Sequence, residues 1–166
     1  MKHLTLALIL LLPSIPFAKA DACRDLYQLT DDTLAVGPGV AVPAEGAVPA
    51  HCRVRGVIGR GIRFEVRMPV RGWNRRFLFE GTGGFAGYLA DTTRGLADGY
   101  AVATTDTGHQ GAGAYEFLLQ PQAFLDYAFR GIHLATTVTK RVVSTYYGKS
   151  PASPTSKDAQ MAVASH

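Results

Sequence analysis

Residues 100–111 read YAVATTDTGHQG, a short apolar run followed by a polar loop that contains glycine. The apolar part, residues 100–105, is predicted to be a β-strand that ends at Asp106, because short apolar runs bounded by turn signals are typical of strands. Ligand sites of α/β folds form beyond the carboxyl ends of strands. The 106–111 loop is therefore expected at a functional edge of a sheet.

Two further strands and one long helix are predicted around this stretch. Residues 62–68 alternate apolar and charged side chains, which indicates a strand with one wet face. Residues 76–80 contain the run FLF, which suits a buried strand. Residues 126–147 are predicted to form a helix capped by Gly148, because apolar residues recur at spacings of three and four. That apolar stripe consists of Ala128, Ile132, Ala135, Val138, Val142 and Tyr146.

A second loop, residues 81–87, follows the buried strand and reads GTGGFAG. Its four glycines allow backbone N–H groups to approach a ligand closely. In α/β-hydrolases a loop after an early strand donates one N–H to the oxyanion hole, so Gly83 and Gly84 are the candidate donors. The loop lacks the Gly-Lys-Ser/Thr ending of a phosphate-binding loop. A plain tight turn is the alternative.

Three other polar residues have side chains that could take part in catalysis. Asp106 and His109 are predicted to hold their loop by local hydrogen bonds rather than to act as a catalytic dyad, because no nucleophile is placed beside them. His133 is predicted to be a surface or packing residue of the long helix, for the same reason.

The chain of 166 residues, 47% hydrophobic and 18% charged, has the composition of one globular domain. Residues 1–20 are predicted to be a secretory signal, with Lys2 at the basic start, an apolar core and small residues before the cleavage point. The apolar run is too short to span a bilayer, so a retained membrane anchor is the weaker alternative. A secreted or periplasmic protein with no membrane attachment after cleavage is expected.

Cleavage after Ala20 would lower the formal charge from +4 to +2, because Lys2 and Lys19 are lost. This bias is too small to indicate nucleic-acid binding. Residues 21–51 are rich in Gly, Pro and Ala and are predicted to be an irregular N-terminal arm.

Cys23 and Cys52 are predicted to form a disulfide that ties this arm to the next segment, with two free thiols as the alternative. Neither cysteine has metal-ligand spacing to a histidine, so no metal or cofactor is expected, and a small metalloenzyme is the least favoured class.

Taken in order, several segments resemble the tannase and feruloyl esterase family. The resemblance implies that residues 52–152 are the N-terminal strands and helices of a doubly wound sheet, an incomplete α/β-hydrolase. It also implies a secreted serine esterase that cleaves esters of aromatic acids such as gallate or ferulate, with a small aromatic ester as its partner. Some family members hold calcium in a large inserted lid. The matching segments are 52–56, 62–69, 73–77, 81–87, 99–109 and 126–148.

The family places its nucleophile directly after the segment that resembles residues 149–152, within Gly-Cys-Ser-(Thr or Asn)-Gly-Gly-Arg-Gln. Here residues 153–166 read SPTSKDAQMAVASH. No serine has the glycine-flanked context of a nucleophile elbow, so no member of a Ser-Asp-His triad is assigned and all three are expected beyond Ala152. We therefore expect the N-terminal portion of an esterase, inactive by itself. The alternative is a non-catalytic exported domain that binds a small aromatic ligand or a partner.

The 153–166 tail is predicted to arise from a frameshift. Codons for these residues exist that, after one A is restored in codon 153, encode Tyr-Ser-Tyr-Phe-Lys-Gly-Cys-Ser-Asn-Gly-Gly-Arg-Gln, the expected elbow. Sequencing the gene from codon 153 should show such a codon set. A nucleotide sequence that encodes no elbow in any frame would contradict the prediction.

Overall fold

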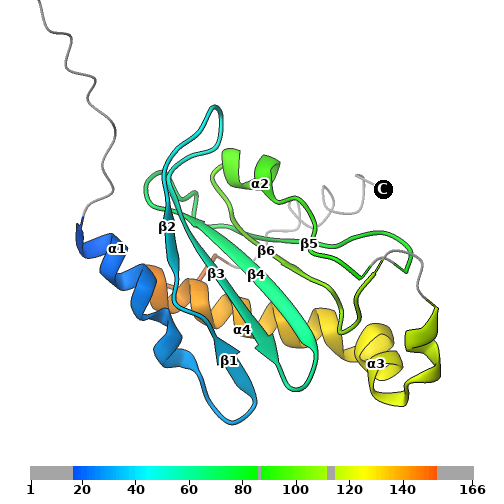
Figure 1. Cartoon of the computed structure of the whole chain (residues 1–166). Helices are drawn as coiled ribbons and strands as arrows, with labels where there is room; N and C mark the ends of the chain where they lie inside the picture. The colour runs from blue at the N-terminus through cyan, green and yellow to red at the C-terminus, as the bar shows by residue number, and fades with distance from the viewer. Residues whose placement is uncertain (1–16, 86, 112–114, 153–166) are drawn as a thin grey trace, which may run out of the picture.

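The computed structural model describes residues 17–85, 87–111 and 115–152, which form a mixed β-sheet covered by helices (Figure 1). None of the helices in this described part is long and apolar enough to cross a membrane. The elements in chain order are α1 (Phe17–Arg24), η1 (Asp25–Leu29), β1 (Leu34–Val36), β2 (Val40–Val42), β3 (His51–Ile58), β4 (Ile62–Pro69), β5 (Phe77–Glu80), α2 (Thr93–Ala97), β6 (Ala101–Thr105), η2 (Glu116–Leu119), α3 (Pro121–Leu125), η3 (Asp126–Arg130) and α4 (Gly131–Tyr147).

The strands of the described residues lie in the order β1-β3-β4-β6-β5, and β2 also pairs with β3. The pairing is antiparallel from β1 to β6, whereas β5 and β6 run parallel, with Phe79 opposite Ala103. The predicted strands at 62–68, 76–80 and 100–105 are confirmed as β4, β5 and β6. Strand β3 has no counterpart among the predicted strands.

The prediction of an irregular arm over residues 21–51 is wrong, because this segment contains η1, β1 and β2. Both short strands pair with β3, with Ala35 opposite Val57 and Ala41 opposite Cys52. Strands of three residues are too short to show an alternating pattern, so their formation depends on the neighbouring edge of β3.

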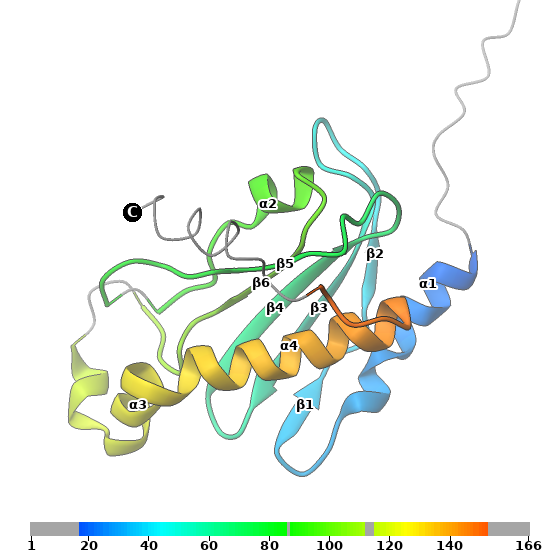
Figure 2. The same cartoon turned by 180° about the vertical axis from the view of Figure 1, so that it is seen from behind.

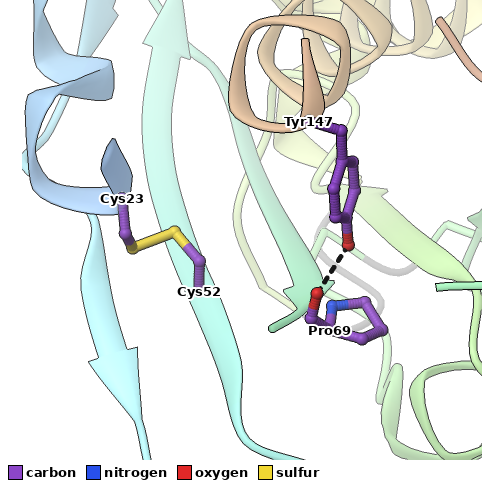
Figure 3. The surroundings of a disulfide bond; sticks show 4 residues. All are labelled: Cys23, Cys52, Pro69 and Tyr147. Atoms are coloured by element: carbon purple, nitrogen blue, oxygen red, sulfur yellow. Dashed lines mark hydrogen bonds between the residues drawn. A yellow bond between two sulfur atoms is a disulfide. The ribbon is translucent and has the colours of Figure 1, made fainter. Parts of the chain in front are cut away.

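The predicted disulfide between Cys23 and Cys52 is confirmed, and it fastens α1 to β3 (Figure 3). Its two cysteines are 29 residues apart in the sequence. Closing a loop of this length removes conformational entropy from the unfolded chain and stabilises the fold by roughly 3–4 kcal/mol.

The hydrophobic core lies between α4 and one face of the sheet (Figure 2). All five residues of β6 are buried, as expected for a central strand covered on both faces. On the other face, α2 packs against β6, with Gly95 next to Leu78 and Val102. Core residues shared by the sheet and α4 include Val54, Phe64, Val66, Met68, Ala101, Ala103, Ala135, Val142 and Val143.

Helix α4 confirms the predicted long helix, but the helix is preceded by a π-helical turn, η3. A π-turn inserts an extra residue and rotates the face that follows. The predicted stripe is therefore only partly confirmed: Ile132 is 54% exposed, while Ala135, Val142 and Tyr146 are buried. Gly148 adopts φ +65° and caps the helix as predicted.

The C-terminal end of α4 is fixed to the end of β4 by an aromatic contact. Tyr147 stacks on Trp73 with ring centroids 3.7 Å apart, and its hydroxyl donates to the Pro69 carbonyl at 2.8 Å (Figure 3). Burial raises the pKa of Tyr147 above its ordinary value, so the hydroxyl keeps the proton that this hydrogen bond needs.

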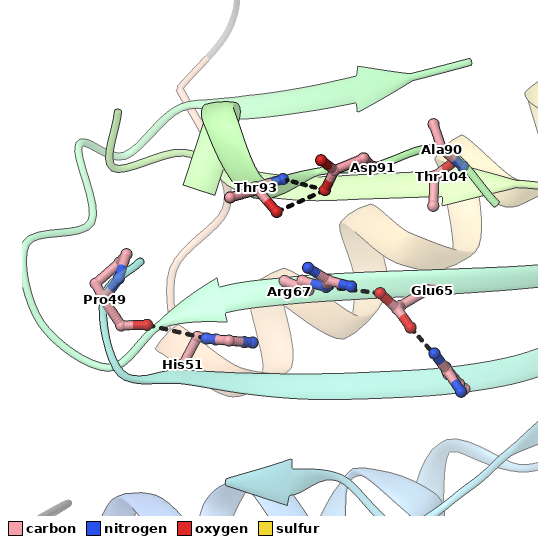
Figure 4. A network of polar contacts seen from close by, with 9 residues as sticks. Pro49, His51, Glu65, Arg67, Ala90, Asp91, Thr93 and Thr104 are labelled. Atoms are coloured by element: carbon pink, nitrogen blue, oxygen red, sulfur yellow. Dashed lines mark hydrogen bonds and ion pairs between the residues drawn. The ribbon is translucent and has the colours of Figure 1, made fainter. Parts of the chain in front are cut away.

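The charged face of β4 is not uniformly wet, contrary to the prediction for residues 62–68. Glu65 is buried, and its carboxylate forms ion pairs with Arg55 and Arg67 (Figure 4). Burial by itself raises the pKa of Glu65, but the two guanidinium groups outweigh it and lower the pKa below its ordinary value. The two arginines therefore offset the free-energy cost of burying this carboxylate.

Candidate functional site

The two loops singled out in the sequence meet in one site. Because β5 and β6 run parallel, the 81–87 loop and the 106–111 loop leave the sheet at the same edge. The backbones then pair directly: Gly87 N–H donates to Gly111 O at 3.0 Å, and Gly111 N–H donates to Gly87 O at 3.1 Å. Position 87 accepts only glycine, since a Cβ there would lie 2.6 Å from His109 Cδ2.

His109 links the two loops through its side chain. The ring is buried and stacks on Phe117 with centroids 3.9 Å apart. Its Nε2 lies 2.9 Å from the carbonyl oxygen of Phe85, which makes Nε2–H the donor of that hydrogen bond. The nitrogen is thus engaged with the glycine-rich loop, which agrees with the predicted holding role rather than with that of a general base.

Asp106 anchors the second loop to β4. Its Oδ1 accepts hydrogen bonds from the N–H of Gly108 at 3.0 Å and from the N–H of Arg63 at 2.9 Å, as predicted for a loop-holding residue. Its Oδ2 is buried and has no hydrogen-bond partner among the described residues. Burial therefore raises the pKa of Asp106 above its ordinary value, despite the two backbone donors.

Tyr127, which the sequence analysis did not single out, contacts the glycine-rich loop from η3. Its hydroxyl donates to Gly84 O at 2.9 Å. The ring packs near those of Phe85, Phe117 and His109, with centroids 5.7, 5.0 and 5.3 Å away. The high frequency of aromatic residues in 115–129 was the available signal in the sequence. It indicated a cluster, but not which loop the cluster supports.

Gly83 and Gly84 lie on the exposed side of this supported loop. A Cβ at either position would meet nothing within 4 Å, so space for a ligand exists there. Within the described ranges, no acceptor is hydrogen-bonded to the N–H of either glycine. Gly84 has φ +61°, a left-handed conformation that glycine adopts without strain.

The remaining polar candidates lie outside the site. His133 is exposed on α4, which confirms its predicted surface position. Ser144 and Ser150 lie at the C-terminal end of α4, where their hydroxyl oxygens are 3.4 Å apart. In the part of the chain that the structure describes, no three His, Cys, Asp or Glu residues converge on a possible metal site.

A cavity of about 360 Å³ opens near the start of α4 and the turn between β3 and β4. Neither candidate glycine lines it, and His109 does not line it either. This cavity is therefore separate from the loop site. Its lining residues are Ile58, Gly59, Arg60, Ile62, Gln122, Asp126, Arg130 and Leu134.

The raised pKa of Asp106 predicts a specific pH dependence of stability. A carboxyl group that binds its proton more tightly when folded favours the folded state increasingly as the pH falls from neutral towards its ordinary pKa of 3.8. Asp106→Asn keeps the Oδ1 acceptor and cannot ionise. The stability of wild type relative to Asp106→Asn, measured by urea unfolding, should therefore rise over this range. Exposed Asp32→Asn is the matched control, and a difference that stays constant or falls would contradict the assignment.

The sequence model of the tannase and feruloyl esterase family matches residues 47–156. An uncharacterized esterase from Xanthomonas campestris is 37% identical over 150 residues, covering 78% of this chain and 26% of that protein. A mono(2-hydroxyethyl) terephthalate hydrolase from Piscinibacter sakaiensis is 30% identical, covering 81% of this chain and 28% of that protein.

The crystal structure of feruloyl esterase B from Aspergillus oryzae has a TM-score of 0.70 to this chain at 21% identity. The likeness covers 81% of this chain and 31% of that one, so this chain spans less than a third of the length of the relatives it matches. It confirms the expected fold, an incomplete α/β-hydrolase-like sheet with helices. Sequence and fold together show that this chain belongs to the tannase and feruloyl esterase family.

Proposed function

We propose that this chain is the oxyanion-loop portion of an exported serine esterase that cleaves carboxylic esters of aromatic acids. The observation that carries the proposal is the arrangement of the 81–87 loop. Its inner side is bound to the 106–111 loop, whereas the N–H groups of Gly83 and Gly84 have no acceptor among the described residues. An oxyanion hole requires backbone N–H donors that the fold holds in place and that are not already bound to an acceptor.

Ester cleavage begins when a serine oxygen attacks the acyl carbon, and negative charge then develops on the carbonyl oxygen. A backbone N–H aimed at that oxygen contributes roughly 3–4 kcal/mol to the stability of the transition state. The contribution depends on a donor that does not have to reorient during the reaction. The backbone pairing of Gly87 with Gly111 and the His109 contact supply this rigidity.

In this proposal the nucleophile, its base and the acid are supplied by residues outside the described ranges. Strand β5 pairs with β6 on one side and has no strand on its other side among the described residues. A parallel strand added there would end at the same edge as the 81–87 loop and would present an elbow serine towards it. Export and the removal of residues 1–20 belong to the proposal, and residues 1–16 and 153–166 lie outside the described structure.

An aromatic acyl group is supported by two observations. Phe85 and Tyr115 are 40% and 60% exposed beside the loop, with ring centroids 5.4 Å apart in an edge-to-face arrangement. Such rings offer an aromatic ligand both apolar area and favourable ring–ring geometry. The relatives compared above also include a feruloyl esterase and a terephthalate ester hydrolase.

The same two exposed rings, Phe85 and Tyr115, also favour the second candidate, a non-catalytic exported domain that binds a small aromatic ligand or a partner.

Within the described ranges, neither Ser144 nor Ser150 is hydrogen-bonded to a histidine. The hydroxyl of Ser144 instead donates to Lys140 O at 2.8 Å. These residues therefore supply no activated nucleophile, and turnover separates the two candidates only in a form that contains the elbow.

The purified chain of 166 residues should not hydrolyse methyl ferulate or methyl gallate above the buffer rate, and a fluorophosphonate probe should label none of its serines. The protein encoded after one A is restored in codon 153 should hydrolyse at least one of these esters and be labelled on a single serine. Methyl butanoate is the control for the aromatic acyl group. Stoichiometric labelling and turnover by the chain of 166 residues would contradict its inactivity. A restored protein that binds ferulate without turnover would favour the second candidate.

A further inference from the structure

The cavity of about 360 Å³ lies between the β3–β4 turn and the start of α4 (Figure 2). Strand β4 begins where β6 ends, with Phe64 opposite Thr105, so the cavity is at the same edge of the sheet as the two loops. No residue of the 81–87 loop or the 106–111 loop lines it. Its volume falls within the range of small-molecule sites, about 300–1,000 Å³. The cavity can therefore hold a ligand of its own.

Three apolar side chains from three different elements form one part of the lining. Ile58 of β3 and Ile62 of β4 are 7% and 2% exposed, and Leu134 of α4 packs against the same core. A hydrophobic body placed against these side chains would lose contact with water, which favours binding. The ligand that fits this part of the cavity is therefore apolar.

The charged part of the lining consists of Arg60, Asp126 and Arg130. Asp126 Oδ1 accepts hydrogen bonds from Arg130 Nη1 at 3.0 Å and from Gln122 Nε2 at 2.9 Å, so the charges of Asp126 and Arg130 compensate each other. The side chain of Arg60 forms no ion pair or hydrogen bond with any residue that the structure describes. The cavity therefore presents one uncompensated positive charge. One ligand carboxylate would balance this charge, whereas a dianion would be repelled by Asp126.

The turn that carries Arg60 is fixed by backbone contacts. Ile58 pairs with Ile62, so only residues 59–61 connect the two strands. Gly59 has φ +58°, and its N–H donates to Thr33 O at 2.7 Å. The backbone of Arg60 is thus held at the cavity before any ligand arrives. A guanidinium group can bind a carboxylate through two parallel hydrogen bonds.

We propose that this cavity binds a small monocarboxylic acid, with the hydrophobic body against Ile58, Ile62 and Leu134 and the carboxylate on Arg60. The combination of apolar walls with a single unpaired guanidinium group carries the inference. It does not rest on the proposed esterase function, because neither the ester site nor a nucleophile takes part in binding.

The proposed acid site adjoins the 106–111 loop. A Cβ at Gly108 would lie 2.8 Å from Asp126 Cβ and 3.3 Å from Ile62 Cγ1, and both of these residues line the cavity. Gly108 therefore packs directly against the lining, and its amide resonance should report whether the cavity is occupied.

The test uses the chain of 166 residues, labelled for NMR and titrated separately with cinnamate and with octanoate. Both probes carry one carboxylate on a hydrophobic body, and the tighter of the two shows whether the site takes an aromatic acid or a fatty acid. With at least one of them, the amide resonances of Arg60, Gly108 and Leu134 should shift saturably, with a dissociation constant on the order of 1 mM. Cinnamamide and octanamide, the neutral analogues, should each bind several-fold more weakly than the corresponding acid.

Arg60→Gln removes the unpaired charge from an exposed turn and leaves the core unchanged. It should weaken binding of the acid by about 5-fold, the loss expected for an exposed but bidentate ion pair. Arg71→Gln is the matched control, because Arg71 is also exposed but follows the opposite end of β4. This control should bind the acid as wild type does.

Four results would overturn the inference: no saturable shift with either acid, amides that bind as tightly as the acids, shifts led by Gly83 and Gly84, or unchanged affinity in Arg60→Gln. The third result would place the acid at the loop site rather than in the cavity. A failure of the proposed esterase function would instead appear in the hydrolysis assay, since no turnover is measured in these titrations.

Discussion

Burial of β6 between two layers is the constraint on which the rest of the structure depends. Its five residues are all buried, with the α4 core on one face and α2 on the other. Antiparallel pairing to β4 and parallel pairing to β5 fix its register, with Thr105 opposite Phe64 and Ala103 opposite Phe79. Because both ends of the strand are fixed, the loop that follows Thr105 starts from a defined point at the edge of the sheet.

The two loops of the site are held in place through their attachment to β6. The carboxylate of Asp106 accepts a hydrogen bond from the N–H of Arg63 in β4, so the 106–111 loop is bound to β4 as soon as it leaves the sheet. Three residues later, His109 reaches the carbonyl of Phe85, and Gly111 pairs with Gly87. The glycine-rich loop has few side chains of its own to pack, and it is held by groups that the core positions. The buried sheet thereby holds the 81–87 loop in place, although the outer side of this loop is exposed.

Local patterns in the sequence predicted much of this arrangement. The alternation in 62–68, the FLF run in 76–80 and the apolar stretch in 100–105 each indicate a strand without reference to the rest of the chain. The presence of only two cysteines in a protein with a predicted secretory signal predicts the disulfide between Cys23 and Cys52. The two candidate loops are visible in the sequence because each contains glycines and follows a predicted strand.

Features that depend on a distant partner were not predictable in the same way. Strands β1 and β2 form because β3 offers an edge, and Glu65 is buried because Arg55 and Arg67 neutralise it. The π-turn before α4 has no local signal in the sequence, and Ile132 of the predicted stripe is exposed whereas Val142 is buried. Tyr127 contacts Gly84 across 43 residues of sequence, and no local pattern indicates the direction of that peptide group.

The central claim is that the 81–87 and 106–111 loops are bound to each other and act as one site. The most direct measurement is the hydrogen-exchange rate of the Gly111 amide in Gly87→Ala and in the matched control Gly83→Ala. A Cβ at position 87 would lie 2.6 Å from His109 Cδ2 and 2.7 Å from His109 O, whereas one at position 83 meets nothing within 4 Å. The Gly111 amide should exchange much faster in Gly87→Ala and remain protected in Gly83→Ala. Equal protection in both variants would contradict the claim.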